Sequence, residues 1–440
     1  MPVYTCEKCG KEFKYQSALK RHMNRKTPCR KNIFYVAETF VGCGGSHFGF
    51  KKSGFKTIFV NDIWEDAIKT LKNNDTLLSD NRIICDDIKN INIDMLKKRN
   101  INDIDKIDVL IGGVVCKGFS LAGIRNPYDE RNYLYLEQLR LVKELRPKIS
   151  IIENVPAMKN MRILSKENNN DITKLCIELN DICEKHKSQR GKLIANKKSL
   201  EKEESKLSKD EIKEKIILNK TEIDNLVKKR KELEKKLDKY KYSVVEDIEK
   251  KYDELGYNVY KKILKCSDYD CSTNRKRLFI VAIDKKLNLD WKYPEPITHD
   301  NPPTVRDAFN KLDYDNINNP INDIDNVPMN HKPTTIEKFK KIKSGVKSNN
   351  GYFSRGTSSR LSYDVPAPTL VPGHSSFQIH PSEHRSITVR EGGIITGFDK
   401  DFKFYGSHSS RCMQIGNAIP VNMAYHLAEQ CKKILHSNTK

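Results

Sequence analysis

Cys116 is the residue whose setting most directly suggests chemistry. It lies between Gly113 and Gly118, in a loop that follows the apolar run Asp108 to Ile111. The run predicts a buried parallel strand, and the glycines let the backbone after it approach a ligand closely. A thiol just beyond the carboxyl end of such a strand is typical of a nucleophile at the edge of an open α/β sheet. The alternative is a buried, inert cysteine, and the neighbouring motifs decide between the two.

A second set of reactive residues opens the chain, with the spacing Cys-x2-Cys-x12-His-x6-Cys. The candidate zinc ligands are Cys6, Cys9, His22 and Cys29. Phe13 and Leu19 lie where a small zinc finger has its two core residues, and a unit this polar needs a tetrahedral metal to fold. If its helix enters a major groove, Tyr15, Ala18 and Arg21 face the bases. The sequence therefore predicts a structural zinc finger over residues 1–30, whose partner is DNA or a protein.

A glycine-rich turn follows the first strong strand pattern, Tyr35 to Phe40, with glycines at 42, 44 and 45. Glycines there let the backbone approach a ligand where a strand turns into a helix. The next two predicted strands end in Asn61-Asp62 and Asp86-Asp87, where carboxylates can hold ribose hydroxyls and an adenine amine. This order indicates a Rossmann-like nucleoside site beside the Cys116 loop. The turn lacks the spacing of the pyrophosphate fingerprint, which disfavours a dehydrogenase.

The composition favours a nucleic-acid partner. The 440 residues carry a formal net charge of +22 with a pI near 9.3. Such an excess suits a polyanion, first nucleic acid and second an anionic membrane surface. No run approaches the roughly eighteen apolar residues of a membrane span, and the N-terminus has no signal-peptide pattern. Because twelve scattered cysteines suit a reducing compartment, we expect an intracellular protein that binds nucleic acid and no membrane.

Taken in order, these motifs resemble those of the DNA (cytosine-5) methyltransferases. The matching stretches are Phe40-Val41-Gly42-Cys43-Gly44-Gly45, Asp62, Asp87-Ile88, Gly112-Gly113-x-x-Cys116-x-Gly118-Phe119-Ser120, Ala122-Gly123-x-Arg125, Asp129-x-Arg131-Asn132, Glu153-Asn154-Val155, Arg275-x-Arg277, Thr388-Val389-Arg390-Glu391 and Gln414-Ile415-Gly416-Asn417-Ala418. They run in family order from residue 35 to 430, interrupted by one long insertion, which makes the resemblance very specific. The zinc finger and the abundance of Lys, Asn and Ile also resemble genes of large DNA viruses or mobile elements.

The resemblance implies a fold, an activity and a set of site residues. The fold is α/β, a Rossmann-like S-adenosylmethionine-dependent methyltransferase domain with a small target-recognition domain. The activity is methyl transfer from S-adenosylmethionine to C5 of a cytosine flipped out of double-stranded DNA, through a covalent bond between Cys116 and C6. The implied catalytic residues are Cys116, Glu153, Arg275 and Arg277. The implied cofactor-binding residues are Phe40, Gly42, Gly44, Gly45, Asp62, Ile63, Asp87, Ile88, Asn417 and Ala418.

By the same resemblance, Glu153 supplies a proton or hydrogen bond at N3 of the base. Arg275 and Arg277 hold the target base and the loop near the nucleophile. Glu153 follows the apolar run Ile149 to Ile152, so we expect it at the carboxyl end of another strand, beside the Cys116 loop.

Three positions depart from the family's pattern. Val114-Val115 stands where the family has Pro-Pro, Lys117 stands where it has Gln, and Thr273 replaces a Gln two residues before Arg275. Valines preset the loop backbone less than prolines do. The Lys117 charge favours the Cys116 thiolate or contacts phosphate. None of these changes removes a reacting atom.

Two other functions stay open from the sequence. One is a catalytically impaired DNA-binding relative that keeps the fold and the zinc finger and has lost turnover through the changes from Val114 to Lys117. Cofactor binding without methyl transfer would identify it. The other is an RNA (tRNA) cytosine-5 methyltransferase of the same family. That group has Pro-Pro-Cys-Gln-Pro around its nucleophile and a Cys-Phe-Thr signature, and neither is present here.

The insertion, residues 166–241, predicts an antiparallel coiled-coil hairpin. Its apolar residues fall on two heptad registers, Ile172 to Leu207 and Ile212 to Tyr240. Ser208 and Glu211 predict a capping box at the start of the second helix. The roles open to such a hairpin are a solvated spacer, an arm for self-association or a protein partner, and an arm that tracks DNA with its lysines.

The chain therefore divides into six segments. They are the zinc finger 1–30, the first part of the catalytic domain 33–165, the hairpin 166–241, the second part of the catalytic domain 242–290, the target-recognition domain 291–404 and the closing segment of the catalytic domain 405–440. The closing segment includes a predicted helix, Asn422 to Leu435, and the resemblance implies that it completes the cofactor pocket. Its removal is expected to abolish cofactor binding.

Overall fold

The computed structural model describes residues 4–5, 12–13, 15–25, 33–114, 130–165, 170–200, 208–312, 323–345, 359–370 and 377–437. Cys116 with most of its loop, and the candidate zinc ligands Cys6, Cys9 and Cys29, lie outside these residues. Within these ranges, none of the helices combines the length and the apolar character that crossing a membrane requires.

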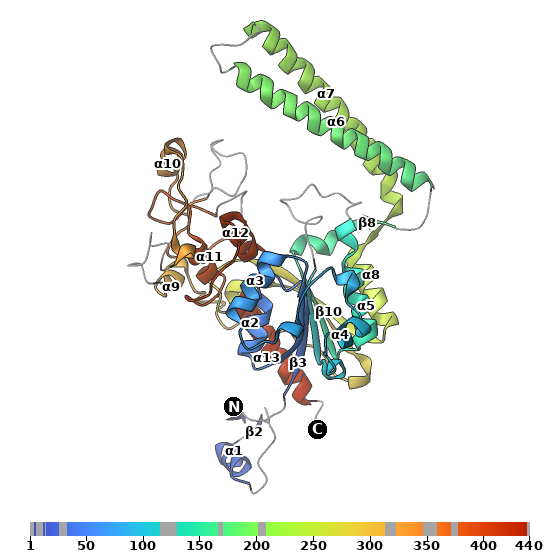
Figure 1. The fold of residues 1–440 in the computed structure, drawn as a ribbon, viewed down its shortest axis with the longest axis vertical. Coiled ribbons are helices and arrows are strands. Elements are labelled where there is room, and N and C mark those ends of the chain that lie inside the picture. Colours follow the sequence, from blue (N-terminus) through green and yellow to red (C-terminus); the bar gives the residue numbers. More distant parts are fainter. Residues whose placement is uncertain are drawn as a thin grey trace.

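A seven-stranded sheet in the order β10-β11-β7-β6-β3-β4-β5 forms the centre of the molecule (Figure 1). Its parallel strands are β3 (Tyr35–Thr39), β4 (Lys56–Asp62), β5 (Ile83–Cys85), β6 (Val109–Gly113) and β7 (Ile149–Asn154). Its antiparallel strands are β10 (Tyr257–Lys265) and β11 (Lys276–Asp284). The strands predicted from the sequence are confirmed. From β3 the chain moves outward to β4 and returns on the other side as β6, so a ligand-binding switch point lies at their carboxyl ends.

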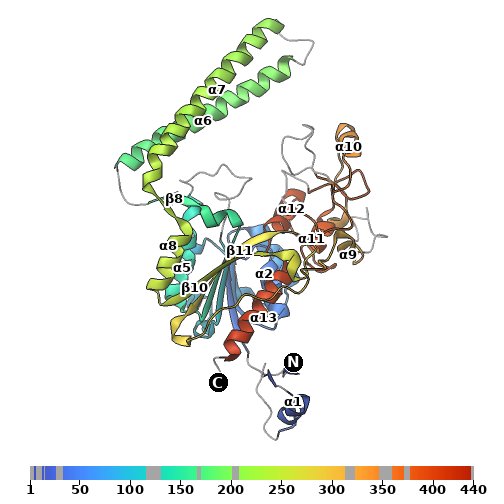
Figure 2. The ribbon, with the colours of Figure 1, turned by 180° about the vertical axis from the view of Figure 1, so that it is seen from behind.

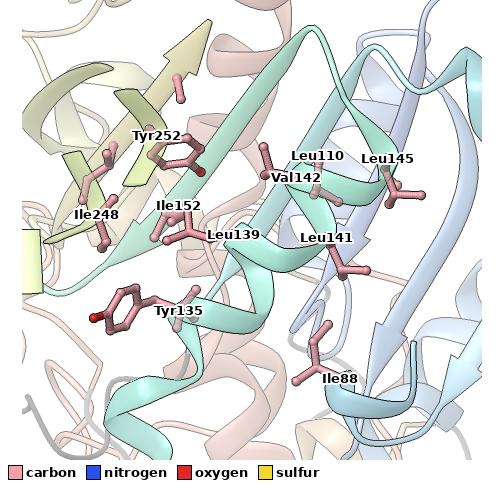
Figure 3. Close-up of a cluster of buried hydrophobic side chains, with 14 of the residues drawn as sticks. Ile88, Leu110, Tyr135, Leu139, Leu141, Val142, Leu145, Ile152, Ile248 and Tyr252 are labelled. Carbon is pink, nitrogen blue, oxygen red and sulfur yellow. The ribbon is translucent and has the colours of Figure 1, made fainter. Parts of the chain in front are cut away.

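Helices cover both faces of this sheet because its strands alternate two sets of apolar side chains. On one face, Val109 and Ile111 pack with α2 (Gly45–Lys52) and α13 (Val421–Ser437). On the other, Leu110 packs with α5, α8 and α4. These helices span Tyr135–Leu145, Val244–Glu254 and Ile93–Lys98, in that order. Leu139 and Val142 of α5 lie over Leu110 and Ile152 (Figure 3), and the expected Rossmann-like α/β fold is confirmed.

Residues 291–404 are less regular than the sheet, and their apolar cluster also includes Cys43 of the glycine turn and residues of the closing segment such as Ile415. The helices of this part are α9 (Val305–Phe309), α10 (Pro333–Lys340) and α11 (Val389–Ile395), and α12 (His408–Asn417) follows. In the described stretches of this part, β pairing is limited to isolated bridges. Buried Arg360 satisfies backbone carbonyls that have no strand partner in these stretches. Its guanidinium donates hydrogen bonds to the carbonyls of Phe339, Ile342 and His380, each at 2.7 Å.

The insertion forms a hairpin of two long helices, α6 (Asn170–Leu200) and α7 (Lys209–Leu237) (Figure 2). Ser208 and Glu211 form the predicted capping box. Apolar residues along the inner sides of the two helices are buried together, among them Leu179, Ile182 and Leu233. The two helices are therefore confirmed, while their supercoiling stays a prediction. At the root, β8 (Arg162–Leu164) pairs antiparallel with β9 (Lys241–Ser243).

Candidate active site

The carboxyl edge of the sheet carries the glycine-rich turn between β3 and α2. The backbone φ is +51° at Phe40, +57° at Gly42 and +98° at Gly44, a left-handed conformation that suits glycine. A Cβ on Gly42 would meet no atom within 4 Å, so the space beside this turn is open. A Cβ on Gly45 would lie 2.1 Å from the carbonyl oxygen of Ile419. Only glycine therefore lets the closing segment pack against the turn.

Asp62, at the end of β4, ties this turn in place. Its carboxylate accepts hydrogen bonds from the backbone N–H of Gly42 at 2.8 Å and of Trp64 at 2.9 Å. Burial raises the pKa of Asp62, and these N–H groups work against the rise. The next side chain, Ile63, is 69% exposed and offers an apolar surface, before α3 (Glu65–Asn74) begins. An acid beside an open glycine turn and an exposed apolar side chain fits a nucleoside.

Asp87 and Ile88, which follow β5, have different surroundings. Asp87 is half-buried and accepts a hydrogen bond from the backbone N–H of Lys89 at 3.0 Å. Ile88 is buried in the apolar cluster that α5 covers (Figure 3). Between them and the sheet, Asn61 Nδ2 donates to the carbonyl of Asp86 at 2.8 Å. The contacts of Asp87 and Ile88 with the cofactor stay predictions, and the Ile88 side chain packs in the core.

β6 leads into the Cys116 loop, and its end is tightly fitted. A Cβ on Gly112 would come within 2.6 Å of Thr39 Oγ1 and 2.7 Å of Gln138 Oε1, so this strand end has no room for a side chain. Val114 is buried, and its carbonyl accepts a hydrogen bond from Asn154 Nδ2 at 3.0 Å. The path of the chain toward the nucleophile is therefore fixed as far as Val114, although valine replaces proline there.

Glu153 and Arg277 form a buried ion pair beside this strand. Glu153 Oε1 lies 2.7 Å from Arg277 Nε, and the side chains are 8% and 10% exposed. The parallel register pairs Glu153 with Gly113, next to the start of the Cys116 loop. Burial raises the pKa of Glu153, whereas Arg277 and Arg275 lower it. A carboxyl group whose pKa is raised can carry a proton toward neutral pH, as proton donation to a ring nitrogen requires.

Arg275 makes a different connection. It donates to the carbonyl oxygen of Gly416 at 2.6 Å and to that of Asn417 at 3.3 Å. The Thr273 hydroxyl, at the position of the family's Gln, accepts a hydrogen bond from the Arg275 backbone N–H at 3.3 Å. Arg275 thus fixes the closing segment just before Ala418, whose Cβ lies 3.2 Å from the Cβ position of the Gly45 turn. The two arginines thus contact different groups, although both lower the pKa of Glu153.

A buried histidine beneath the turn was not apparent from the sequence. His47 of α2 lies 3.0 Å from Glu38 of β3 and 2.8 Å from Asp75, which Lys51 also contacts at 2.5 Å. Burial lowers the pKa of His47, but the hydrogen bonds to Asp75 and Glu38 outweigh it and raise the pKa to about 9. The charged ring therefore ties α2 to β3. Its carboxylate partners lie 9 and 28 residues away in sequence, so no local motif reveals them.

The N-terminal residues have the ββα order of a small zinc finger. β1 (Tyr4–Thr5) pairs antiparallel with β2 (Glu12–Phe13), and α1 (Gln16–Met23) follows. His22 is buried with its ring 4.9 Å from that of Phe13, while Tyr15 and Arg21 are exposed. In the part of the chain that is described, no group of three or more His, Cys, Asp and Glu side chains could hold a metal ion. Three of the four predicted ligands fall outside that part.

Comparison with known protein families identifies the family that has this fold and this arrangement of motifs. The family described as C-5 cytosine-specific DNA methylase matches residues 34–243 and 234–433. The chain belongs to this family. The predicted enzyme class, a DNA cytosine-C5 methyltransferase, is confirmed for this methylase. A C2H2-type zinc finger also matches, over residues 4–25, so the predicted finger is confirmed as a unit. The ligand roles of Cys6, Cys9, His22 and Cys29 stay predictions, and Cys29 lies beyond the match.

Relatives of this C-5 cytosine-specific methylase match along most of their length. Type II methyltransferase M.Eco47II of Escherichia coli is 25% identical over 434 residues, which cover 94% of this chain and 82% of that protein. Type II methyltransferase M.DdeI of Desulfomicrobium norvegicum is 25% identical over 447 residues, covering 90% and 88%. A solved structure, of a candidate DNA modification methyltransferase encoded within a prophage of E. coli, shares the fold at a TM-score of 0.58 and 23% identity, covering 91% and 99%. A viral or mobile-element origin stays a prediction.

Proposed function

We propose that this methylase transfers the methyl group of S-adenosylmethionine to C5 of cytosine in double-stranded DNA through a covalent bond between Cys116 and C6 of the base. The observation that carries the mechanism is the buried Glu153–Arg277 pair, adjacent to the strand that leads to Cys116. A carboxyl group whose pKa is raised at this point suits proton donation to a ring nitrogen, which a protein that only binds DNA does not need.

The proposed reaction proceeds by addition of the thiolate to the base, methyl transfer and elimination of the thiolate. Because cytosine C5 is a weak nucleophile, the Cys116 thiolate first adds to C6 and opens the ring double bond. Glu153 donates a proton or hydrogen bond at N3, which stabilises the charge that builds on the ring and leaves C5 enamine-like. Bound S-adenosylmethionine supplies the methyl group that C5 takes up. The C5 proton then passes to solvent, which expels Cys116 as a thiolate and restores the double bond; the N3 proton returns to Glu153, and the spent cofactor would leave as S-adenosylhomocysteine.

We assign the cofactor to the open side of the glycine turn. Asp62 suits the ribose hydroxyls, because each carboxylate oxygen accepts one backbone N–H and keeps a free lone pair. Ile63 offers an apolar contact for adenine, with Asp87 near the adenine amine. Asn417 and Ala418 border the methionine part, next to Gly45 in the closing segment. The turn itself consists of Phe40, Gly42, Gly44 and Gly45, and Phe40 packs against the apolar cluster that contains Ile88.

We assign DNA recognition to parts outside the catalytic sheet. Residues 291–404, whose apolar cluster joins them to the glycine turn and the closing segment, serve as the target-recognition domain, and the segments 33–165, 242–290 and 405–440 form the catalytic domain. The cytosine leaves the duplex to reach the nucleophile, at a cost of roughly a few kcal/mol. The finger, residues 1–30, binds zinc through Cys6, Cys9, His22 and Cys29. That metal is structural, since it replaces the core that so short a unit lacks.

Transfer of a labelled methyl group from S-adenosylmethionine to mixed-sequence duplex DNA tests this function. We expect incorporation as 5-methylcytosine by the natural protein and none by Cys116→Ala, which should still bind DNA and cofactor. Duplexes that contain 5-fluorocytosine test the covalent step, because fluorine cannot leave C5 as a proton and the Cys116 adduct persists. Binding of DNA without incorporation would favour the catalytically impaired relative. Incorporation into tRNA alone would favour the RNA-directed enzyme.

A further inference from the structure

The helical hairpin is fixed at its root to the catalytic edge of the sheet. The chain enters β8 shortly after Glu153 and returns as β9. The hydroxyl of Tyr133 donates to the carbonyl of Leu164 in β8 at 2.8 Å, and the hydroxyl of Tyr135 lies 3.1 Å from that of Tyr242 in β9. Tyr133 and Tyr135 follow the Cys116 loop. The hairpin is thus braced against the two segments that carry the proposed catalytic residues, and it projects from that edge (Figures 1 and 2).

The buried seam of the hairpin defines which residues share an outer face. The seam includes Ile172, Leu179 and Ile182 of α6 and Ile212, Ile216, Leu233 and Leu237 of α7. Continuing both seams at helical spacing puts Arg190 and Lys197 on one flank of α6 and Lys213 and Lys220 on the corresponding flank of α7. In an antiparallel pair, corresponding flanks lie on the same side of the hairpin. These four basic residues therefore share one face, in the half of the hairpin farther from the root.

Two exposed isoleucines lie at the centre of this face. Ile194 is 54% exposed and Ile217 is 63% exposed. They come at about the same height, because α6 and α7 run in opposite directions from the turn between them. We call the surface made by Arg190, Lys197, Lys213, Lys220, Ile194 and Ile217 the distal basic face.

The cations of the distal basic face are largely unneutralised. Within the described chain, Arg190, Lys197 and Lys220 have no acid at ion-pair distance, and Lys213 pairs with Asp210 at 2.9 Å. The opposite face differs, because acids such as Glu178, Asp181, Glu211, Glu222 and Glu232 alternate there with the lysines. The excess charge of the hairpin is therefore concentrated on one side of its outer half.

We propose that the distal basic face binds the phosphate backbone of the DNA duplex whose cytosine occupies the active site. At 1.5 Å per helical residue, Arg190 and Lys197 lie about 30–40 Å from the root, which corresponds to roughly 9–12 base pairs of B-form DNA. A duplex held at the catalytic edge extends over this distance on either side of its target. This second contact rests on the proposed function, since it needs DNA at the catalytic edge.

Self-association through the same face is disfavoured. Two copies meeting there would bring their unneutralised cations together, and like charges in contact cost free energy. Backbone phosphates instead present a regular row of negative charges, and each contact with a lysine or arginine releases a counterion. Ile194 and Ile217 are the feature that a protein partner would use, so the experiment separates their contribution from that of the cations.

The test compares the DNA affinity of two charge-matched variants on short and long duplexes. The face variant carries Arg190→Gln, Lys197→Gln, Lys213→Gln and Lys220→Gln. The control variant carries Lys174→Gln, Lys192→Gln, Lys215→Gln and Lys229→Gln, which remove the same charge from the same helices on the other flank. Fluorescence anisotropy is measured at several salt concentrations with duplexes of about 12 and about 40 base pairs. The short duplex ends before the distal basic face, and the long one extends beyond it.

We expect the natural protein and the control variant to bind the long duplex more tightly than the short one. The face variant should lose that gain, with an affinity for the long duplex lower by about tenfold or more at low salt. Its slope of log K against log salt should fall by about 3–4 units, near 0.9 for each lost phosphate contact. All three proteins should keep the same affinity for the short duplex and the same helical content by circular dichroism.

Three results would overturn this inference. The first is an equal loss of affinity for the long duplex in the face and control variants. The second is a natural protein that binds the long duplex no more tightly than the short one. The third is a loss of affinity for the long duplex in the double variant Ile194→Ser with Ile217→Ser but not in the face variant. The last would show that the two isoleucines, rather than the cations, make the second contact. Failure of the proposed function is separate, because it would show as no methylation of the short duplex, whose binding does not involve the hairpin.

Discussion

Replacing Arg277 by methionine is expected to destabilise the protein strongly at alkaline pH and much less at acidic pH. Arg277 and Glu153 are both buried, with 2.7 Å between Nε and Oε1. Removing one partner of a buried ion pair costs about 3–5 kcal/mol, because the remaining charge is left without compensation. Methionine keeps much of the apolar bulk of the arginine stem, so the loss reports the charge rather than a cavity.

The pH dependence follows from the pKa of Glu153. Burial already raises it above its ordinary value, and Arg277 is the largest of the influences that lower it, so Arg277→Met raises it further. The folded variant then holds a proton that the unfolded chain has released, and its stability falls as pH rises from the unfolded pKa through the folded one. Each further unit of pKa adds about 1.4 kcal/mol to the loss at high pH.

Urea unfolding of the natural protein and the variant at pH 5.5 and pH 8.0 measures this difference. The double variant Glu153→Gln with Arg277→Met is the control, because it removes both charges and leaves no buried carboxylate. It should recover most of the stability and show little pH dependence. The reasoning would be refuted if Arg277→Met lowered the free energy of unfolding equally at both pH values. It would also be refuted if the double variant were no more stable than the single one.

The glycine turn and the metal give two more tests. Gly45→Ala introduces a Cβ 2.1 Å from the Ile419 carbonyl oxygen, and overpacking of about 1–3 kcal/mol should weaken S-adenosylmethionine binding roughly 5- to 150-fold by calorimetry. Gly191→Ala, whose Cβ meets nothing within 4 Å, is the control, and equal affinities for the two variants would contradict the packing argument. Chelation should release one zinc per chain and unfold residues 1–30 while the sheet stays folded. A zinc indicator and amide exchange measure both effects, and a zinc content unchanged in His22→Ala would contradict the ligand assignment.

Much of the fold could be predicted because its signals are local. The apolar run before Glu153 and the acids after β4 and β5 marked strand ends, and parallel strands bring such ends to one edge. The capping box of Ser208 and Glu211 likewise depends on residues three apart. Patterns of this kind place a residue on an element, and the order of the elements then places it at the site.

Partners chosen by packing could not be predicted. Arg275 and Arg277 are two residues apart and were expected to act together, yet one binds carbonyls of residues 416 and 417 and the other binds Glu153. His47 with Glu38 and Asp75 gave no signal, because the three come from separate elements. Ile88 matched the family pattern, and only the packing under α5 shows that its side chain is buried. Such contacts join residues that sequence spacing does not relate.

The packing of α13 on α2 has a consequence for synthesis of the chain. The glycine turn is complete only when Ile419 lies against Gly45, and α2 is covered only when Ala424 packs on Gly49. At about 5–20 residues per second, a ribosome makes these residues on the order of 20–75 s after the turn itself. Until then one apolar face of the sheet is not covered by α13, and exposed apolar surface of this kind is what chaperones bind. A chain synthesised only as far as residue 418 therefore lacks the contact between Ile419 and Gly45 that completes the glycine turn.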